Sequence, residues 1–187
     1  MYHKLSKERP DLLIGGCWIH ARIPFADFIK SIKGSADGTI AHKAYSLITE
    51  MLHIDNGFDD LPSDDRLKQR QLILTEKVDA YFKWVKLKYN QVTHNSTIGK
   101  ALAYSIHQEP YLRTFLTDGD VPMDNNYAEQ AIRPFTIGRK NFVLIESSNG
   151  ARASAMIYIL VETAKANYLN VYQYLELLLT EIPKHMN

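Results

Sequence analysis

Apolar residues recur every three or four positions over most of this chain, the spacing that is typical of amphipathic helices. Polar, glycine-containing or proline-containing stretches separate these segments and mark their ends. The predicted helices cover residues 22–33, 39–54, 64–92, 96–107, 110–116, 124–134, 150–167 and 171–182. Ser63 is the predicted N-cap of the longest helix, and Pro24 is expected in the first turn of its own helix, where proline is tolerated.

Two segments have strand character instead. Residues 11–18, DLLIGGCW, form a short apolar run, and residues 138–147 alternate loosely and are expected to form a hairpin arm or a short extended strand. A strand needs hydrogen-bonding neighbours, and this chain offers few. The pattern therefore predicts a mainly α fold with few short strands, and the unpaired strand suggests that part of a sheet precedes this sequence.

Composition indicates a folded protein. The chain has 187 residues, of which 45% are hydrophobic and 11% aromatic, enough for a real core. Its single cysteine, Cys17, excludes an internal disulfide framework and fits the reducing cytoplasm. No apolar stretch approaches the roughly 20 residues that span a bilayer, so we expect no membrane partner. The formal net charge is +1, so any contact with DNA must come from a local basic patch.

Residues 124–141, DNNYAEQAIRPFTIGRKN, are the most informative part of the sequence. Asp124 can cap a helix that Pro134 then ends, because proline cannot donate the next helical hydrogen bond. Asn126, Glu129 and Arg133 are spaced i, i+3 and i+7, so they share one face of this helix. A carboxylate on a rigid helix beside basic side chains suits metal-assisted chemistry on a phosphodiester.

The same residues also allow a simpler interpretation. Arg133, Arg139, Lys140 and Arg152 lie in a stretch whose only acidic residue is Glu146, which predicts a local basic patch. However, Glu129 and Arg133 at i, i+4 could form an ordinary surface ion pair that contributes roughly 0.3–0.5 kcal/mol. Spacing alone leaves both interpretations open.

Other constellations are weaker. Cys17 and His20 have half of a zinc-site spacing, but a tetrahedral site needs four ligands and the chain has no second cysteine. A Cys–His protease dyad would also need an oxyanion-binding group, which is not evident. Trp18 and Trp84 could stack on unpaired bases, although core packing is the commoner role of tryptophan. The clustered arginines and histidine of a tyrosine recombinase are not found.

The long motifs of this sequence resemble those of a known family. DNNYAEQAIRP, GRKN, the small-residue loop after it and the later TAKAN resemble the C-terminal motifs of the insertion-sequence-66 family of bacterial DDE transposases. The upstream segments CWIHAR and STIGKALAYSIHQEPYLRTFLTDGDVPMDNN are also similar to that family, so the resemblance covers nearly the whole chain. Gln130 departs mildly, since the family often has arginine there.

The resemblance implies a ribonuclease-H-like core in which two aspartates and one glutamate hold two Mg²⁺ or Mn²⁺ ions. Glu129 matches the third of these acidic residues, the catalytic and metal-binding glutamate. The residues that the resemblance places on DNA are Asn126, Arg133, Arg139, Lys140 and Arg152. The residues expected to shape the site are Cys17, His20, Asp124 and Asn125.

The resemblance also implies a domain organisation and a missing part. We expect a remnant of the core at residues 1–21, an all-helical insertion at 22–122, the acidic helix and basic segment at 123–148, and a C-terminal helical element at 149–187. The first two aspartates of the family precede its CW-HAR segment, so we expect a C-terminal transposase fragment that is inactive without its N-terminal segment. Expected partners are that segment, the DNA of transposon ends and target, and further copies of the chain. The alternative is a non-catalytic helical module for DNA binding or subunit assembly.

Overall fold

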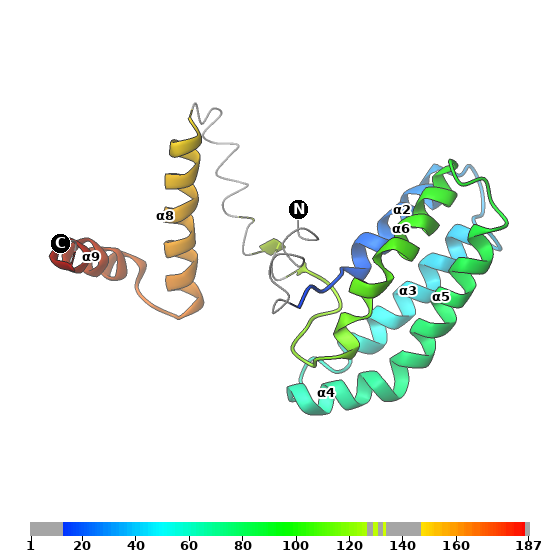
Figure 1. The fold of residues 1–187 in the computed structure, drawn as a ribbon, viewed down its shortest axis with the longest axis horizontal. Helices are drawn as coiled ribbons and strands as arrows, with labels where there is room; N and C mark the ends of the chain where they lie inside the picture. Colours follow the sequence, from blue (N-terminus) through cyan, green and yellow to red (C-terminus); the bar gives the residue numbers. More distant parts are fainter. Residues whose placement is uncertain (1–12, 127–128, 131–132, 134–146, 186–187) are drawn as a thin grey trace. The chain divides into compact units, whose positions relative to one another are not determined.

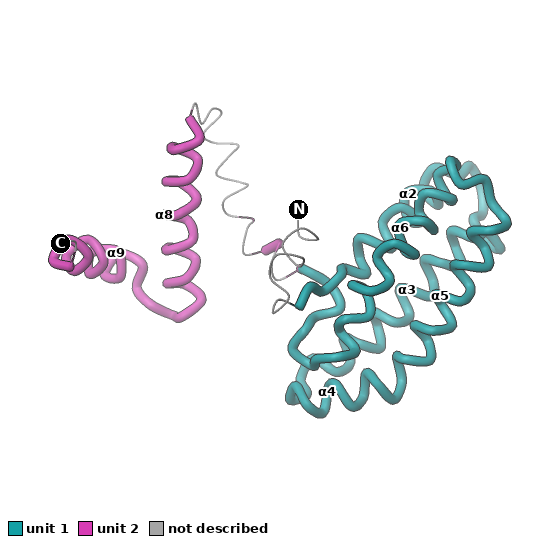
Figure 2. The backbone as a smooth tube through the Cα atoms, viewed as in Figure 1, with its two compact units in different colours: residues 1–125 teal, residues 126–187 magenta. Residues whose placement is uncertain are grey.

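The computed structural model describes residues 13–126, 129–130, 133 and 147–185 of this chain. The chain has two compact units, Met1–Asn125 and Asn126–Asn187 (Figure 2). Regular structure in the described residues is helical, with no strand among them, which confirms the expected mainly α class. Within these same ranges, no helix is long and apolar enough to cross a membrane.

Unit 1 contains a bundle of four helices. These are α2 (Trp18–Ser31), α3 (Ile40–Asn56), α5 (Thr75–Tyr89) and α6 (Thr97–Leu112). Helix α2 packs against α3 and α6, and α5 packs against the same two helices, so the four enclose one core (Figure 1). Each helix turns its apolar stripe inward, as the periodicity predicts.

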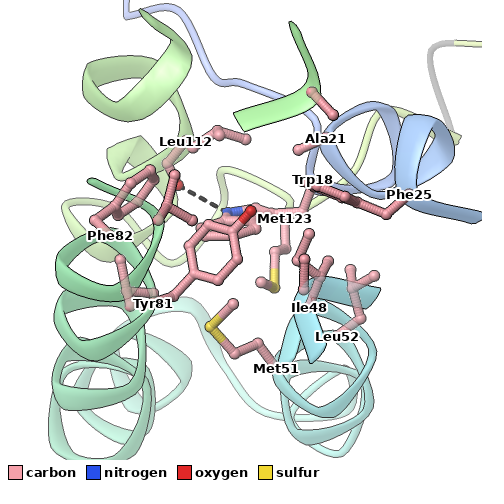
Figure 3. Close-up of a cluster of buried hydrophobic side chains, with 14 of the residues drawn as sticks. Trp18, Ala21, Phe25, Ile48, Met51, Leu52, Tyr81, Phe82, Leu112 and Met123 are labelled. Atoms are coloured by element: carbon pink, nitrogen blue, oxygen red, sulfur yellow. Dashed lines mark hydrogen bonds between the residues drawn. The ribbon is translucent and has the colours of Figure 1, made fainter. Parts of the chain in front are cut away.

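Trp18 lies in the core of this bundle. Its side chain is fully buried, and its ring centroid lies 5.4 Å from that of Tyr81, 5.7 Å from Phe82 and 6.4 Å from Phe115. The indole Nε1 donates a hydrogen bond of 2.9 Å to the carbonyl oxygen of Leu112, drawn as the dashed line in Figure 3. The ring therefore buries a large apolar area while its polar atom stays satisfied, which ties the start of α2 to the end of α6.

Side-chain caps fix the starts of α3 and α6. The Thr39 hydroxyl accepts a hydrogen bond from the backbone N–H of His42, and the Ser96 hydroxyl accepts one from Gly99. Such caps satisfy N–H groups that have no partner within the helix. Both starts agree with the sequence prediction within one residue, because capping depends on local residues only.

The predicted strand at residues 11–18 is wrong where the structure describes it. Residues 13–17 have no regular structure, and Trp18 already begins α2. The backbone N–H of Gly16 donates to the carbonyl oxygen of Tyr111 at 2.7 Å, and that of Trp18 to Met123 at 3.1 Å. These groups bond a helix end and a loop, so the segment needs no neighbouring strand. A Cβ at Gly16 would lie 2.9 Å from the backbone N of Leu112, so this close approach requires glycine.

Helix α2 begins four residues earlier than predicted, and this places Pro24 inside the helix. The backbone N–H of Ala21 donates to the carbonyl oxygen of Cys17, so the helix is established before the proline is reached. The buried side chains of α2, Trp18, Ala21 and Phe25, hold this first turn against the core, and tertiary packing therefore overrides the local cost of proline.

The long helix predicted at 64–92 consists of three segments. They are α4 (Ser63–Gln69), a π-helical turn η1 (Arg70–Leu74) and α5. Ser63 is not the cap, because Pro62 occupies the N-cap position and makes no side-chain capping bond. Leu72 and Leu87, two apolar residues of this predicted helix, are 77% and 56% exposed. The π turn adds one residue to the helix, so the inward-facing positions of α5 are shifted by one residue along the sequence relative to those of α4. A prediction that assumes one uniform helical period misses this shift.

Helix α6 is longer than predicted. It runs through Pro110 to Leu112, and a 3-10 turn, η2 (Thr114–Leu116), follows it. The two helices predicted at 96–107 and 110–116 are therefore one helix and one short turn, again with a proline tolerated inside a packed helix.

Unit 2 contains α8 (Ser148–Ala166), α9 (Val171–Glu181) and the 3-10 turn η3 (Ile182–His185). The Ser147 hydroxyl caps α8 and the Asn170 side chain caps α9. Helix α8 packs against α9, and its apolar side chains range from the buried Ala164 through the half-buried Leu160 and Val161 to the exposed Met156 and Ile159. Asn126, Glu129, Gln130 and Arg133 have helical backbone, whereas the strand predicted at 138–147 lies outside the described residues except for Ser147.

Candidate functional site

Four of the predicted site residues belong to unit 1: Cys17 and His20 lie at the start of α2, and Asp124 and Asn125 lie in the segment before the acidic helix. Cys17 is the N-cap residue of α2 and is half-buried, without a side-chain capping bond. The hydrogen bond from Trp18 to the carbonyl oxygen of Met123 places this helix start beside the residue that precedes Asp124. Asp124 and Asn125 are half-buried, and His20 is exposed on α2. The structure therefore brings the Cys17 backbone close to the segment that leads into the acidic helix.

The electrostatic effect of Cys17 reaches one neighbour from α6. Burial, and to a smaller extent the charge of a Cys17 thiolate, raise the pKa of Tyr104 above its ordinary value of 10.0. Cys17 is thus close to the Tyr104 hydroxyl, between α2 and α6.

The acidic and basic site residues belong to unit 2. Asn126, Glu129 and Arg133 are exposed, and Arg152 is exposed in the N-terminal part of α8. Arg139 and Lys140 lie outside the described residues. The helical backbone at 126, 129 and 133 agrees with the shared face that the spacing predicts.

These residues provide only part of what a divalent cation needs. Glu129 offers an accessible carboxylate, the oxygen ligand that Mg²⁺ prefers. No group of three or more His, Cys, Asp or Glu side chains that could hold a metal occurs within the described ranges. Glu129 could therefore supply one ligand of a metal site, and the remaining ligands of such a site would have to come from other residues.

A buried ion pair, which the sequence analysis did not predict, holds the loop that leads to the acidic helix. Arg70 in η1 and Asp55 in α3 have side chains only 1% and 6% exposed. The Arg70 Nε–Asp55 Oδ1 distance is 2.7 Å and the Arg70 NH2–Asp55 Oδ2 distance is 3.0 Å, which is bidentate geometry. Such a pair forms charge-assisted hydrogen bonds and holds the guanidinium in one orientation.

The same guanidinium holds the loop after α6. Its NH1 group donates to the carbonyl oxygen of Val121 at 2.8 Å and to that of Gly119 at 3.1 Å, with longer contacts of 3.4 Å to Phe115 and Asp118. Arg66 adds a weaker bond of 3.4 Å to the Gly119 carbonyl. The buried Arg70 guanidinium thus donates to carbonyl groups of residues 115–121, the segment that leads to Met123 and Asp124.

The sequence does carry a sign of this pair. Arg70 lies three residues after Leu67 and four before Leu74, and Asp55 follows Met51 and Leu52 at helical spacing. Opposite charges on the apolar faces of two helices indicate a buried ion pair, because an unpaired buried charge is very costly.

A second polar cluster connects α5 and α6. Arg113 bridges Glu109 at 2.9 Å and Asp79 at 2.6 Å, and Lys86 contacts Glu109 at 2.7 Å. Burial alone would raise the pKa of Glu109, but the hydrogen bonds from Lys86 and Arg113 outweigh this effect and hold it below 4.5. The cluster is partly exposed and braces the bundle near Phe82, whose ring lies 5.0 Å from the Arg113 guanidinium carbon.

Comparisons with known proteins agree with the motifs. Three relatives from Sinorhizobium fredii (strain NBRC 101917 / NGR234) are similar to the chain, each called an uncharacterized protein. The protein y4qI is 30% identical over 97% of this chain and 34% of its own length, y4jD is 26% identical over 92% and 33%, and y4hP is 27% identical over 90% and 32%. The chain thus spans about a third of the length of these relatives.

No solved structure matches the chain significantly. Residues 1–153 match the family described as "Transposase IS66 family", which covers most of the sequence, including the bundle of unit 1 and the segment around Glu129. The chain therefore belongs to the IS66 family of transposases.

Proposed function

We propose that this chain supplies the third acidic metal ligand and part of the DNA-binding surface of a DDE transposase. The observation that carries the proposal is the exposed carboxylate of Glu129, on helical backbone that it shares with Asn126 and Arg133, inside the family match. Its accessibility suits a group that must reach a cation and DNA. The catalytic assignment itself rests on the matched motif.

In the proposed reaction, a water molecule or a DNA 3′-hydroxyl attacks a phosphodiester at the end of the element. Two Mg²⁺ or Mn²⁺ ions, when bound, would activate the attacking oxygen and stabilise the leaving one. Glu129 would ligate one cation through its carboxylate, and the two aspartates would come from a segment outside this sequence. Arg133, Arg139, Lys140 and Arg152 would hold backbone phosphates, which positions DNA without reading its sequence.

The bundle of unit 1 has a supporting role in this proposal, as the helical insertion of a ribonuclease-H-like core. Arg70 fixes the loop at residues 115–121, and the chain continues from that loop through Asp124 to Glu129. A fixed loop reduces the conformational freedom of the residues that enter the acidic helix. Cys17 and Trp18 would help to position the same entry through the bond to Met123.

The test measures strand cleavage by a transposase in which an aspartate-bearing segment of a relative precedes this chain. Glu129→Gln should abolish Mg²⁺-dependent cleavage while leaving DNA binding intact, because the amide keeps the shape and removes the anionic ligand. Glu176→Gln is the matched control, since Glu176 is an exposed glutamate on α9. Cleavage by Glu129→Gln at the rate of the control would refute the assignment.

A non-catalytic module for subunit assembly is the second candidate. Large apolar side chains on unit 2 favour it: Met156 is 63% exposed, Ile159 65% and Leu179 76%. Exposed apolar surface of this kind often marks a protein interface. Sedimentation of the full chain over a range of concentrations would support this candidate if the Met156→Lys variant dissociated an oligomer, and a monomer at all concentrations would exclude it.

A further inference from the structure

An open cavity of about 450 Å³ lies between the start of α3 and the end of α5. The two helices run side by side in Figure 1. The side chains that matter for its chemistry come from both helices and from the cap of α3: Thr39, His42, Lys43, Ser46, Trp84 and Lys88. Its volume falls within the range of small-molecule pockets, about 300–1,000 Å³.

Trp84 gives this cavity an aromatic wall. It is half-buried and packs against the hydrophobic core on one side while it lines the cavity on the other. Ile40 extends the apolar lining from the first turn of α3. The chain has two tryptophans, and Trp18 is fully buried, so Trp84 is the one that a ligand can reach.

The two lysines at this cavity are not paired with carboxylates of the described residues. Lys88 Nζ donates to the amide oxygen of Gln91 at 2.9 Å, and neither Lys88 nor Lys43 has an ion pair with another described residue. By contrast, Lys77 and Lys86 on the same helix α5 pair with Glu50 and Glu109.

One carboxylate lies near the rim of the cavity. Asp37 Oδ1 is 3.6 Å from His42 Nε2, and the Asp37 side chain is 83% exposed. It is therefore well solvated, and none of the described lining residues is acidic. The lining keeps a positive excess, which attracts an anion.

We propose that this cavity binds one unpaired nucleotide of DNA, with the base against Trp84 and its flanking phosphates near Lys43 and Lys88. An aromatic wall with unpaired cations beside it matches the two parts of a nucleotide, since every base has a flat face and every linkage carries a charge. Duplex phosphates alone would need the lysines but no aromatic side chain. This inference rests on the proposed function, from which DNA follows as the ligand, and extends it to unit 1.

The first experiment follows tryptophan fluorescence while the full chain is titrated with a ten-nucleotide oligothymidylate. Bound thymine should quench the emission of Trp84, and the buried Trp18 should contribute little change. Because the Trp84 variants lack this reporter, their affinity is measured from the anisotropy of a dye-labelled oligothymidylate, and Trp84→Leu should weaken binding by about five-fold or more, the lower end for loss of one base–aromatic stack. Trp84→Phe keeps a ring and should bind with intermediate affinity, and thermal unfolding would check that both variants fold.

The second experiment measures how the affinity depends on salt. Lys43→Gln and Lys88→Gln should each reduce the slope of log K against log salt concentration by about 0.7, the value for one phosphate contact to a single strand. Lys83→Gln is the matched control, because Lys83 is an exposed lysine on α5 that does not line the cavity. Its slope should equal that of the wild-type chain.

The outcomes separate this inference from the function on which it rests. Equal affinity of wild-type, Trp84→Leu and Trp84→Phe chains for the oligothymidylate would overturn the nucleotide pocket alone. Emission of Trp84 that stays unquenched at saturating oligothymidylate would also overturn it, because the bound base would then not lie against this ring. Normal cleavage by Glu129→Gln would overturn the catalytic assignment, whatever the result at Trp84.

Discussion

Replacing Asp55 by alanine would test the buried ion pair that holds the loop before the acidic helix. The change removes both oxygens that contact the Arg70 guanidinium, at 2.7 and 3.0 Å. The guanidinium is 1% exposed, so water cannot replace the carboxylate without rearrangement of the core. The carbonyl groups of residues 115–121 would remain as its only described acceptors.

The size of the effect follows from this burial. Removing one partner of a buried ion pair costs about 3–5 kcal/mol, because the other charge stays buried without compensation. Many domains have a free energy of unfolding of about 5–15 kcal/mol, so Asp55→Ala should remove a large part of the stability of unit 1. The double variant Asp55→Leu/Arg70→Met removes both charges and should recover part of this loss. It should still cost about 1–3 kcal/mol, because the carbonyl oxygens of Gly119 and Val121 lose their donor.

Urea unfolding followed by tryptophan fluorescence would measure these differences, with constant m-values as the check on two-state behaviour. Glu50→Ala is the matched control, since it breaks the half-exposed pair with Lys77 and should cost less than about 1 kcal/mol. If Asp55→Ala costs no more than Glu50→Ala, the assignment of Arg70 as the residue that fixes this loop is incorrect.

Three further changes probe other parts of the bundle by the same unfolding measurement. Gly16→Ala should destabilise the chain by about 1–3 kcal/mol, because its Cβ would meet the Leu112 backbone at 2.9 Å, and a neutral effect would argue against this contact. Ser96→Ala should cost about 1 kcal/mol through loss of the α6 cap, whereas Ser96→Asp should cost much less. In the folded chain, burial would raise the pKa of Glu109, but hydrogen bonds from Lys86 and Arg113 outweigh burial and lower this pKa. The contribution of the Glu109 carboxylate to the free energy of unfolding is therefore full above about pH 4.5 and is lost as the pH falls through the lowered pKa. Glu109→Gln should therefore make stability fall less over that acidic range, and an unchanged pH profile would contradict this cause.

The sequence correctly predicted those features of the fold that depend on residues close together along the chain. The starts of α3 and α6 follow from Thr39 and Ser96, whose hydroxyls cap the next turn. The strand at 11–18 was wrong because an apolar run does not reveal its partner, and here Gly16 approaches the end of α6. Pro24 was misplaced for a similar reason, since packing of the first turn of α2 decides where the helix begins.

Only part of the candidate site could be predicted from the sequence. The resemblance of the motif to the family identified Glu129 as the candidate metal ligand. Helical spacing predicted that Asn126 and Arg133 lie on the same helix face as Glu129, and the helical backbone at these three residues agrees with this. The catalytic role stays a prediction, as do the boundaries expected at residues 21, 122 and 148. Arg70 was missed because its spacing among apolar residues suggests burial but does not identify its partners, which lie in α3 and in the loop at residues 115–121 and are brought together by the tertiary fold.

The wider π turn at Arg70–Leu74 holds one residue more than an α-helical turn. Deleting one residue there would restore a regular α-helix with little rotation of the parts before and after it, because the turn already takes up one extra residue. The same deletion inside α5 would rotate one side of the helix by about 100° around its axis and turn its buried side chains away from the core. We therefore expect deletion of the exposed residue Leu72 to cost far less stability than deletion of one residue within α5.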